Sequence, residues 1–238
     1  MTVGQRVREL RERLTEYPVR EDCQSFAGLP LYELCLDFFP AHLGLLEPHR
    51  ESVSTLVLGH DWGNVDSFRH WLARDAHKKN ATTENTKRLL GRAGFGLCDC
   101  FFTNAWPVLR AGNARHVGYH AMDGDMTLVA AYREYLRETL KVLRIKLVIS
   151  LGHASAWFLG PFYGSKSQIG GLSSPKLVTV EHLDQEPWCE RDGIVFVKAT
   201  HPSFWGPNSR KRCLKSYGDE IGLLIAARRL ARIPDVTQ

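Results

Sequence analysis

The segment Thr55-Leu56-Val57-Leu58-Gly59-His60-Asp61-Trp62-Gly63-Asn64 joins a short apolar run to a polar turn. Its first half is apolar and β-branched and ends in glycine, which is typical of a parallel strand buried on both faces. Two later runs have the same form: Phe101-Phe102-Thr103 leads into Asn104, and residues 195–200 lead into His201. Open α/β sheets place their functional groups just beyond the carboxyl ends of their strands. We therefore expect Asp61, Asn104 and His201 to converge at one crevice.

The rest of the chain alternates between strand and helix patterns. Strands are predicted over residues 55–59, 97–103, 147–152 and 193–200, and helices over 3–17, 83–93, 126–143 and 219–232, with a short helix from Ala154 and Thr83 as an N-cap. This alternation predicts an α/β fold: a three-layer α/β/α sandwich with a central, mainly parallel four-stranded sheet. We expect a single domain over residues 1–238, in which residues 1–50 form a helical N-terminal extension packed on the core.

Composition narrows the class of protein. The chain has 238 residues, of which 44% are hydrophobic and 24% charged, as in ordinary globular domains. No apolar run approaches the roughly 20 residues that a membrane span needs, and the charged N-terminus lacks a secretory signal. The net charge of +5 suits a polyanionic partner, although an ordinary basic surface explains it equally well.

Six cysteines and ten histidines raise the question of metals. No two cysteines have the C-x-x-C spacing of a zinc ribbon, and no HExxH motif is present. Cys98 and Cys100 are expected to share one face of a strand as reduced, buried residues, which favours a reducing compartment, the cytoplasm. We predict no metal and no cofactor.

Each polar residue at a strand end has a chemical and a purely structural interpretation. Asp61 could hold a water or stabilise a cation, or it could cap a turn. Asn104 offers one acceptor and two donors, which match the edge of a pyrimidine, but an Asx turn needs the same residue. His201 could donate to a developing oxyanion and Ser203 to a phosphate, whereas the intervening proline also suits a plain turn.

Aromatic and basic residues follow the last strand. Phe204 and Trp205 directly precede a basic run that includes Arg210 and Lys211. Exposed aromatics beside such a run can wedge into a base stack while the cations bind phosphates. A core aromatic pair followed by a solvated helix start has the same pattern, and both interpretations stay open.

Taken in order, these motifs resemble those of the uracil-DNA glycosylase superfamily, over residues 54–230. In the resemblance, Asp61 falls on the water-activating position and Asn104 on the base-reading position. His201-Pro202-Ser203 is identical to the last motif of the family. The resemblance further implies that Phe204 or Trp205 is the wedge residue and that Ser203, Arg210 and Lys211 contact DNA.

The resemblance also implies a base pocket. Gly59, His60, Trp62 and Gly63 would line it, and Phe68 would stack on the base. Trp62 stands where the family has proline, and His60 replaces the more common Gln, Glu or Met. No cysteine pattern of the iron–sulfur branch is present. The implied function is a base-excision repair glycosylase that hydrolyses the N-glycosidic bond of a flipped-out uracil or related damaged base, acting as a monomer on DNA.

Two alternatives differ in class. Trp62 is large enough to block the pocket, which would leave a nucleic-acid-binding protein of glycosylase fold without catalysis. The second alternative is a small-molecule hydrolase built on a generic parallel sheet. The basic run that includes Arg210 and Lys211 argues against this alternative.

Overall fold

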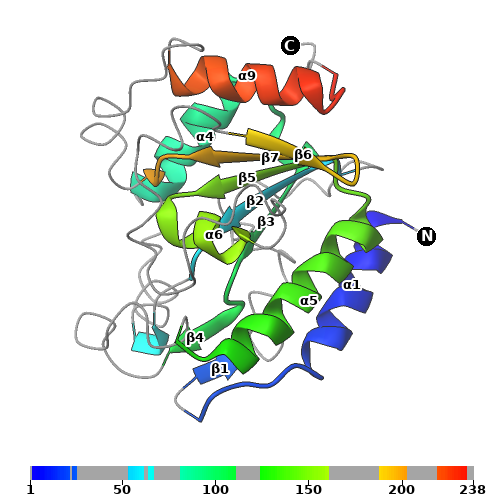
Figure 1. Cartoon of the computed structure of the whole chain (residues 1–238), viewed down its shortest axis with the longest axis vertical. Helices are drawn as coiled ribbons and strands as arrows, with labels where there is room; N and C mark the ends of the chain where they lie inside the picture. Colours follow the sequence, from blue (N-terminus) through cyan, green and yellow to red (C-terminus); the bar gives the residue numbers. More distant parts are fainter. Residues whose placement is uncertain are drawn as a thin grey trace.

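The computed structural model describes residues 2–21, 23–25, 53–61, 64–66, 81–110, 124–160, 188–202 and 219–234. The α/β prediction is confirmed: helices cover both faces of a central sheet (Figure 1). The helices of the described residues are α1 (Val3–Leu14), α4 (Ala81–Arg92), α5 (Met126–Leu143), α6 (His153–Phe158) and α9 (Glu220–Leu230). The strands are β1 (Cys23–Ser25), β2 (Thr55–Gly59), β3 (Cys100–Asn104), β4 (Val108–Arg110), β5 (Leu147–Leu151), β6 (Trp188–Arg191) and β7 (Ile194–Ala199).

The central sheet has five strands within the described residues, in the order β3-β2-β5-β7-β6. The four strands from β3 to β7 are parallel, as predicted, and β6 adds an antiparallel edge. Successive side chains of a strand point to opposite faces, so each of these apolar runs feeds two cores. In β2, for example, Leu56 and Leu58 belong to one core and Val57 to the other.

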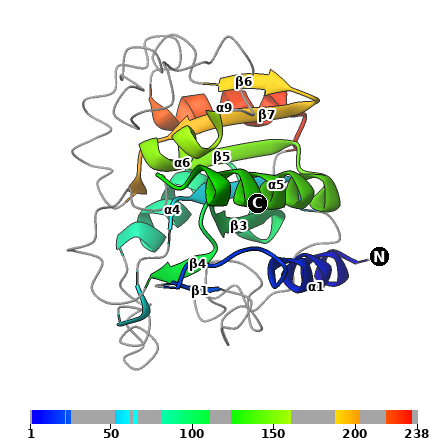
Figure 2. The same cartoon turned by 60° about the horizontal axis from the view of Figure 1, so that its bottom comes forward.

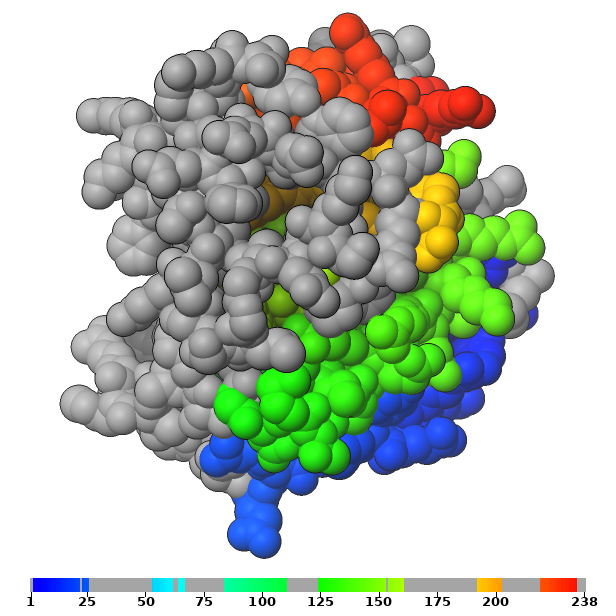
Figure 3. Space-filling model, in the orientation of Figure 1, coloured from blue at the N-terminus to red at the C-terminus, as the bar shows by residue number. Residues whose placement is uncertain are grey.

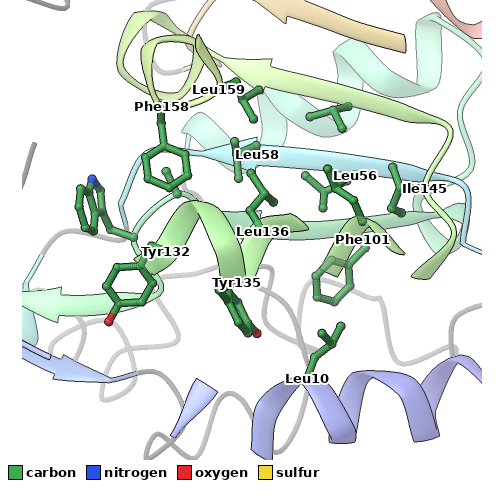
Figure 4. Close-up of a cluster of buried hydrophobic side chains, with 14 of the residues drawn as sticks. Leu10, Leu56, Leu58, Phe101, Tyr132, Tyr135, Leu136, Ile145, Phe158 and Leu159 are labelled. Carbon is green, nitrogen blue, oxygen red and sulfur yellow. The ribbon is translucent and has the colours of Figure 1, made fainter. Parts of the chain in front are cut away.

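One core lies between the sheet and the helices α1, α5 and α6. Leu56, Leu58 and Phe101 of the sheet meet Leu136 of α5 and Leu10 of α1 (Figure 4). At the surface, α1 and α5 lie side by side along one flank of the molecule (Figure 3). The N-terminal helix is therefore part of the fold's main core.

The other core lies under α4 and α9. The opposite face of the sheet is covered by Leu89 and Leu90 of α4 and by Leu223, Leu224 and Ala227 of α9.

Side chains fix the starts of two helices. Asp219 accepts a hydrogen bond from the Gly222 N–H before α9, and Asp125 accepts hydrogen bonds from the Thr127 and Leu128 N–H groups before α5. Both α4 and α9 begin near the carboxyl edge of the sheet.

The structure corrects two sequence predictions and adds a feature that was not predicted. Residues 97–99 form a single 3-10 turn before β3, so Cys98 does not share a strand face with buried Cys100. Thr83 cannot be an N-cap, because α4 starts at Ala81 and already includes it. A separate two-stranded ribbon, β1 with β4, was not predicted and lies beyond the sheet edge near α1 (Figure 2). The strand suggested at residues 176–180 lies outside the described residues.

The packing of α1 can be tested at Leu10, which is fully buried in the core under α5. Replacing Leu10 by Ala should lower the free energy of unfolding by about 2–5 kcal/mol, the usual cost of an unfilled cavity. Arg8→Ala, on the exposed side of the same helix, is the control and should change it little. Urea unfolding of both variants measures the difference. Equal stabilities would show that α1 is not part of the core.

Candidate active site at the carboxyl edge of the sheet

Asp61 and Asn104 are brought together by backbone pairing between β2 and β3. Gly59 lies opposite Asn104 in the parallel register. The pairing continues beyond both strands, because the Ala105 N–H donates to the Gly59 carbonyl at 2.9 Å and the Trp106 N–H donates to the His60 carbonyl at 3.0 Å. The two polar turns therefore leave the sheet side by side.

The turn after β3 is anchored by Trp106. Its ring is fully buried and makes edge contacts with Tyr132 of α5 and Phe158 of α6, at centroid separations of 5.4 and 5.7 Å. Aromatic pairs of this geometry add to the burial of the ring itself. The packing of Trp106 in the core thus fixes the position of the Asn104 backbone.

Asp61 is paired with an arginine that the sequence analysis missed. The side chain of Asp61 is only 5% exposed, and its Oδ2 lies 3.0 Å from Nη2 of Arg110, itself 6% exposed. The Nδ1 of His60 lies 3.7 Å from the same oxygen. Arg110 is the last residue of β4, so the β1–β4 ribbon supplies the cation that balances the buried carboxylate.

Asn104 carries a buried donor without an acceptor. The residue is 5% exposed, and its Nδ2 makes no hydrogen bond to any described part of the chain. Leaving a buried amide N–H unsatisfied costs about 1–3 kcal/mol. A carbonyl oxygen of a bound molecule would recover that cost, so Asn104 is suited to recognise one.

His201 enters the same region from β7. Because Gly152 has φ +90° and no side chain, the turn after β5 can approach this imidazole; a Cβ at Gly152 would lie 3.1 Å from His201 Cβ. The pKa of His201 is lowered, first by burial and then by its electrostatic interaction with the neighbouring His60 imidazole, while Asp61 opposes the shift. His60 and Asp61 are thus close enough to His201 to influence its charge.

Two helices fix the segment around His201 from the other side. Glu220, the buried first residue of α9, accepts from the Thr200 N–H. Asn85 of α4 donates from Nδ2 to the Pro202 carbonyl at 2.8 Å. The residues on both sides of His201 are therefore held by side chains from α4 and α9.

The structure thus gathers five of the residues singled out from the sequence at one edge: Gly59, His60, Asp61, Asn104 and His201. The other eight lie outside the described residues: Trp62, Gly63, Phe68, Ser203, Phe204, Trp205, Arg210 and Lys211. Sequence reasoning missed Asn85, Arg110, Gly152 and Glu220. Of these, Gly152 had a local signal, a glycine ending a buried strand, whereas the others are identified only by contacts across the fold.

The described residues contain neither a metal-binding cluster nor a membrane-spanning helix. Among the described residues, no three His, Cys, Asp or Glu side chains are grouped so as to hold a metal ion. In the same part of the chain, no helix is both long enough and apolar enough to cross a membrane.

No protein-family model matches the sequence, and no curated protein matches it significantly. The function is therefore inferred from the geometry of this edge together with the sequence motifs that lie along it.

The Arg110–Asp61 pair can be tested with a double-mutant cycle. Either Arg110→Ala or Asp61→Ala alone should cost about 3–5 kcal/mol of stability, because each leaves one buried charge unbalanced. The double variant should cost clearly less than the sum of the two. As a control, Arg137→Ala breaks the exposed Arg137–Glu134 pair and should cost less than about 1 kcal/mol. Additive effects in chemical denaturation would contradict the ion pair.

Burial of His201 predicts a pH-dependent stability. Its pKa is lower in the folded protein than the ordinary value near 6.5, so below that pH the unfolded chain binds the proton more readily. Stability should therefore fall as the pH drops from about 6.5 through the lowered folded pKa. His201→Asn should reduce this loss between pH 7 and pH 5 in thermal unfolding. An unchanged loss in the variant would mean that His201 is not the group responsible.

Proposed function

We propose that the protein is a DNA glycosylase, which hydrolyses the N-glycosidic bond of a uracil or related damaged base that has left the helix stack. The observation that carries this proposal is that a carboxylate, an amide and an imidazole, from Asp61, Asn104 and His201, follow parallel strands of one sheet and so lie at the same carboxyl edge. The ordered motifs that resemble the uracil-DNA glycosylase superfamily support the same assignment.

Asn104 is assigned to base recognition. Its buried Nδ2 donor and its amide oxygen match the carbonyl and N–H that a pyrimidine presents side by side. A base must leave the stack to reach this edge, at a cost of a few kcal/mol that is lowest for a mispaired or unpaired base. Binding to Asn104 offsets part of that cost by satisfying the amide.

His201 is assigned to stabilise the leaving base. As the bond between the sugar carbon and the base nitrogen breaks, the electron pair moves onto the base and charge grows on its carbonyl. The lowered pKa keeps the imidazole neutral at neutral pH, and a neutral imidazole still donates one N–H. A donor already held in place, here by the contacts of Thr200 and Pro202, stabilises such charge without reorganisation.

Asp61 is assigned to the sugar and the water. A carboxylate beside the cationic sugar stabilises it and orients a water for attack. As the water oxygen bonds to the sugar carbon, the carboxylate accepts the proton that the water loses, and that proton is finally taken up by the anion of the departed base. Arg110 holds this carboxylate at 3.0 Å and offsets part of its charge. The arginine thus fixes the position of Asp61 but weakens its attraction for a cation.

The weakened attraction of Asp61 for a cation favours an alternative function. In this alternative, the protein has the same fold and binds nucleic acid but does not catalyse a reaction. An aspartate neutralised by a buried guanidinium stabilises a cationic sugar less well than a solitary one. Cleavage assays separate the two functions, because only the glycosylase breaks a glycosidic bond.

The test uses the pure protein and labelled oligonucleotides that carry one uracil, single-stranded or opposite guanine. Heating in alkali after incubation should break the strand at the uracil. Asp61→Ala should abolish breakage, and His201→Ala should lower kcat by about 10²–10³-fold, as the loss of an oxyanion donor does. Asp66→Ala, an exposed aspartate on the same segment, is the matched control and should retain activity.

Three outcomes are distinguishable. Breakage that is lost in Asp61→Ala supports the glycosylase. Binding of the oligonucleotides without breakage supports the alternative and contradicts catalysis on uracil. Neither binding nor breakage would contradict both functions.

A further inference from the structure

The start of α4 connects the His201 segment to the surface of the protein. Asn85 donates to the carbonyl of Pro202, the residue after His201, at 2.8 Å. The two residues are 117 positions apart in sequence, so this is a tertiary contact and not a local turn. It joins α4 to the segment after β7, at the carboxyl edge of the sheet (Figure 1).

Asn85 uses its other polar atom to hold a surface cation. Nη2 of Arg88 donates to Oδ1 of Asn85 at 3.1 Å, and Arg88 is exposed. One amide side chain therefore bridges an exposed guanidinium and the backbone next to His201. Two hydrogen bonds thus link an exposed cation to the segment that carries His201.

The local charge favours an anion. Helix α4 carries Lys87, Arg88 and Arg92 against a single acid, Glu84, which pairs with Lys87 at 3.4 Å. Arginine is suited to phosphodiesters because its planar fork can contact two phosphate oxygens. The hydrogen bond to Asn85 holds the Arg88 side chain before binding, which reduces the conformational entropy lost when a phosphate binds.

We propose that Arg88 binds a backbone phosphate of DNA beside the extruded nucleotide, and that Asn85 is the positioning residue that keeps this phosphate contact in register with His201. The inference rests on the proposed function, since it names a contact of the same substrate. Phosphate contacts fix the register of a protein on its nucleic acid, while contacts to the base select it. Arg88 and Asn104 divide these two tasks.

The phosphate contact is tested by the salt dependence of binding. Arg88→Gln and Arg92→Gln each remove one positive charge from an exposed position on α4, but only Arg88 is bonded to Asn85. Binding of each variant to a short labelled duplex is measured by fluorescence anisotropy at several salt concentrations. Arg88→Gln should weaken binding and reduce the slope of log K against log salt by about 0.9, the value for one lost phosphate contact. Arg92→Gln should leave the slope near that of the parent.

The positioning role is tested with Asn85→Leu, which keeps the size of the side chain and removes both hydrogen bonds. It should lower kcat by roughly tenfold to a hundredfold, because small displacements of a catalytic group have effects of that size, and should change KM less. NMR titration of the His201 imidazole should also show a changed pKa in this variant, a readout that needs no activity. A purely structural role would lower the melting temperature and leave both readouts as in the parent protein.

The outcomes separate this inference from the proposed function. Equal salt slopes for Arg88→Gln and Arg92→Gln, in a parent protein that binds DNA, would overturn the phosphate contact alone. Unchanged kcat and an unchanged His201 titration in Asn85→Leu would overturn the positioning role. A parent protein that binds DNA but does not release uracil would contradict the glycosylase function. The salt slope of Arg88→Gln would in that case still show whether Arg88 contacts a phosphate. A parent protein that binds no DNA would overturn both.

Discussion

The candidate site depends on the parallel pairing of β2 with β3 and on its continuation beyond the two strands. Hydrogen bonds from Ala105 to Gly59 and from Trp106 to His60 keep the two chains in register after the strands end. A shift of one residue would send every side chain to the opposite face and separate Asp61 from Asn104. Burial of Trp106 between α5 and α6 resists that shift, so core packing sets the geometry of the polar edge.

Three elements around the paired strands β2 and β3 each contribute one contact to the site. The ribbon formed by β1 and β4 contributes Arg110 to Asp61, α9 contributes Glu220 to Thr200, and α4 contributes Asn85 to Pro202. Two of these contacts come from helices on one face of the sheet, and the third comes from the ribbon beyond its edge. The polar groups are therefore preorganised by the whole fold, which is the arrangement that electrostatic stabilisation of a transition state requires.

Much of the fold could be predicted because buried parallel strands and long amphipathic helices leave strong local patterns. The bounds of β2 and α5 were predicted to the residue, and the rule for strand ends led us to expect Asp61 and Asn104 at the same edge of the sheet, although it did not predict that β2 and β3 pair directly. Strand β6 was missed although Asp192-Gly193 is a hairpin turn sequence, with positive φ at both residues. Arg110 could not be predicted, because it sits in a three-residue strand and its partner is distant in sequence. Tertiary contacts of this kind have no periodicity.

The central claim is that Asp61, Asn104 and His201 act on one extruded nucleotide. The most direct measurement is a crystal structure of the protein bound to DNA that contains a uridine analogue with a hydrolysis-resistant glycosidic bond. The account predicts a base outside the stack, hydrogen-bonded to the amide of Asn104, with its carbonyl next to His201 and its sugar next to Asp61. A base that stays stacked, or one bound away from this edge of the sheet, would contradict the account.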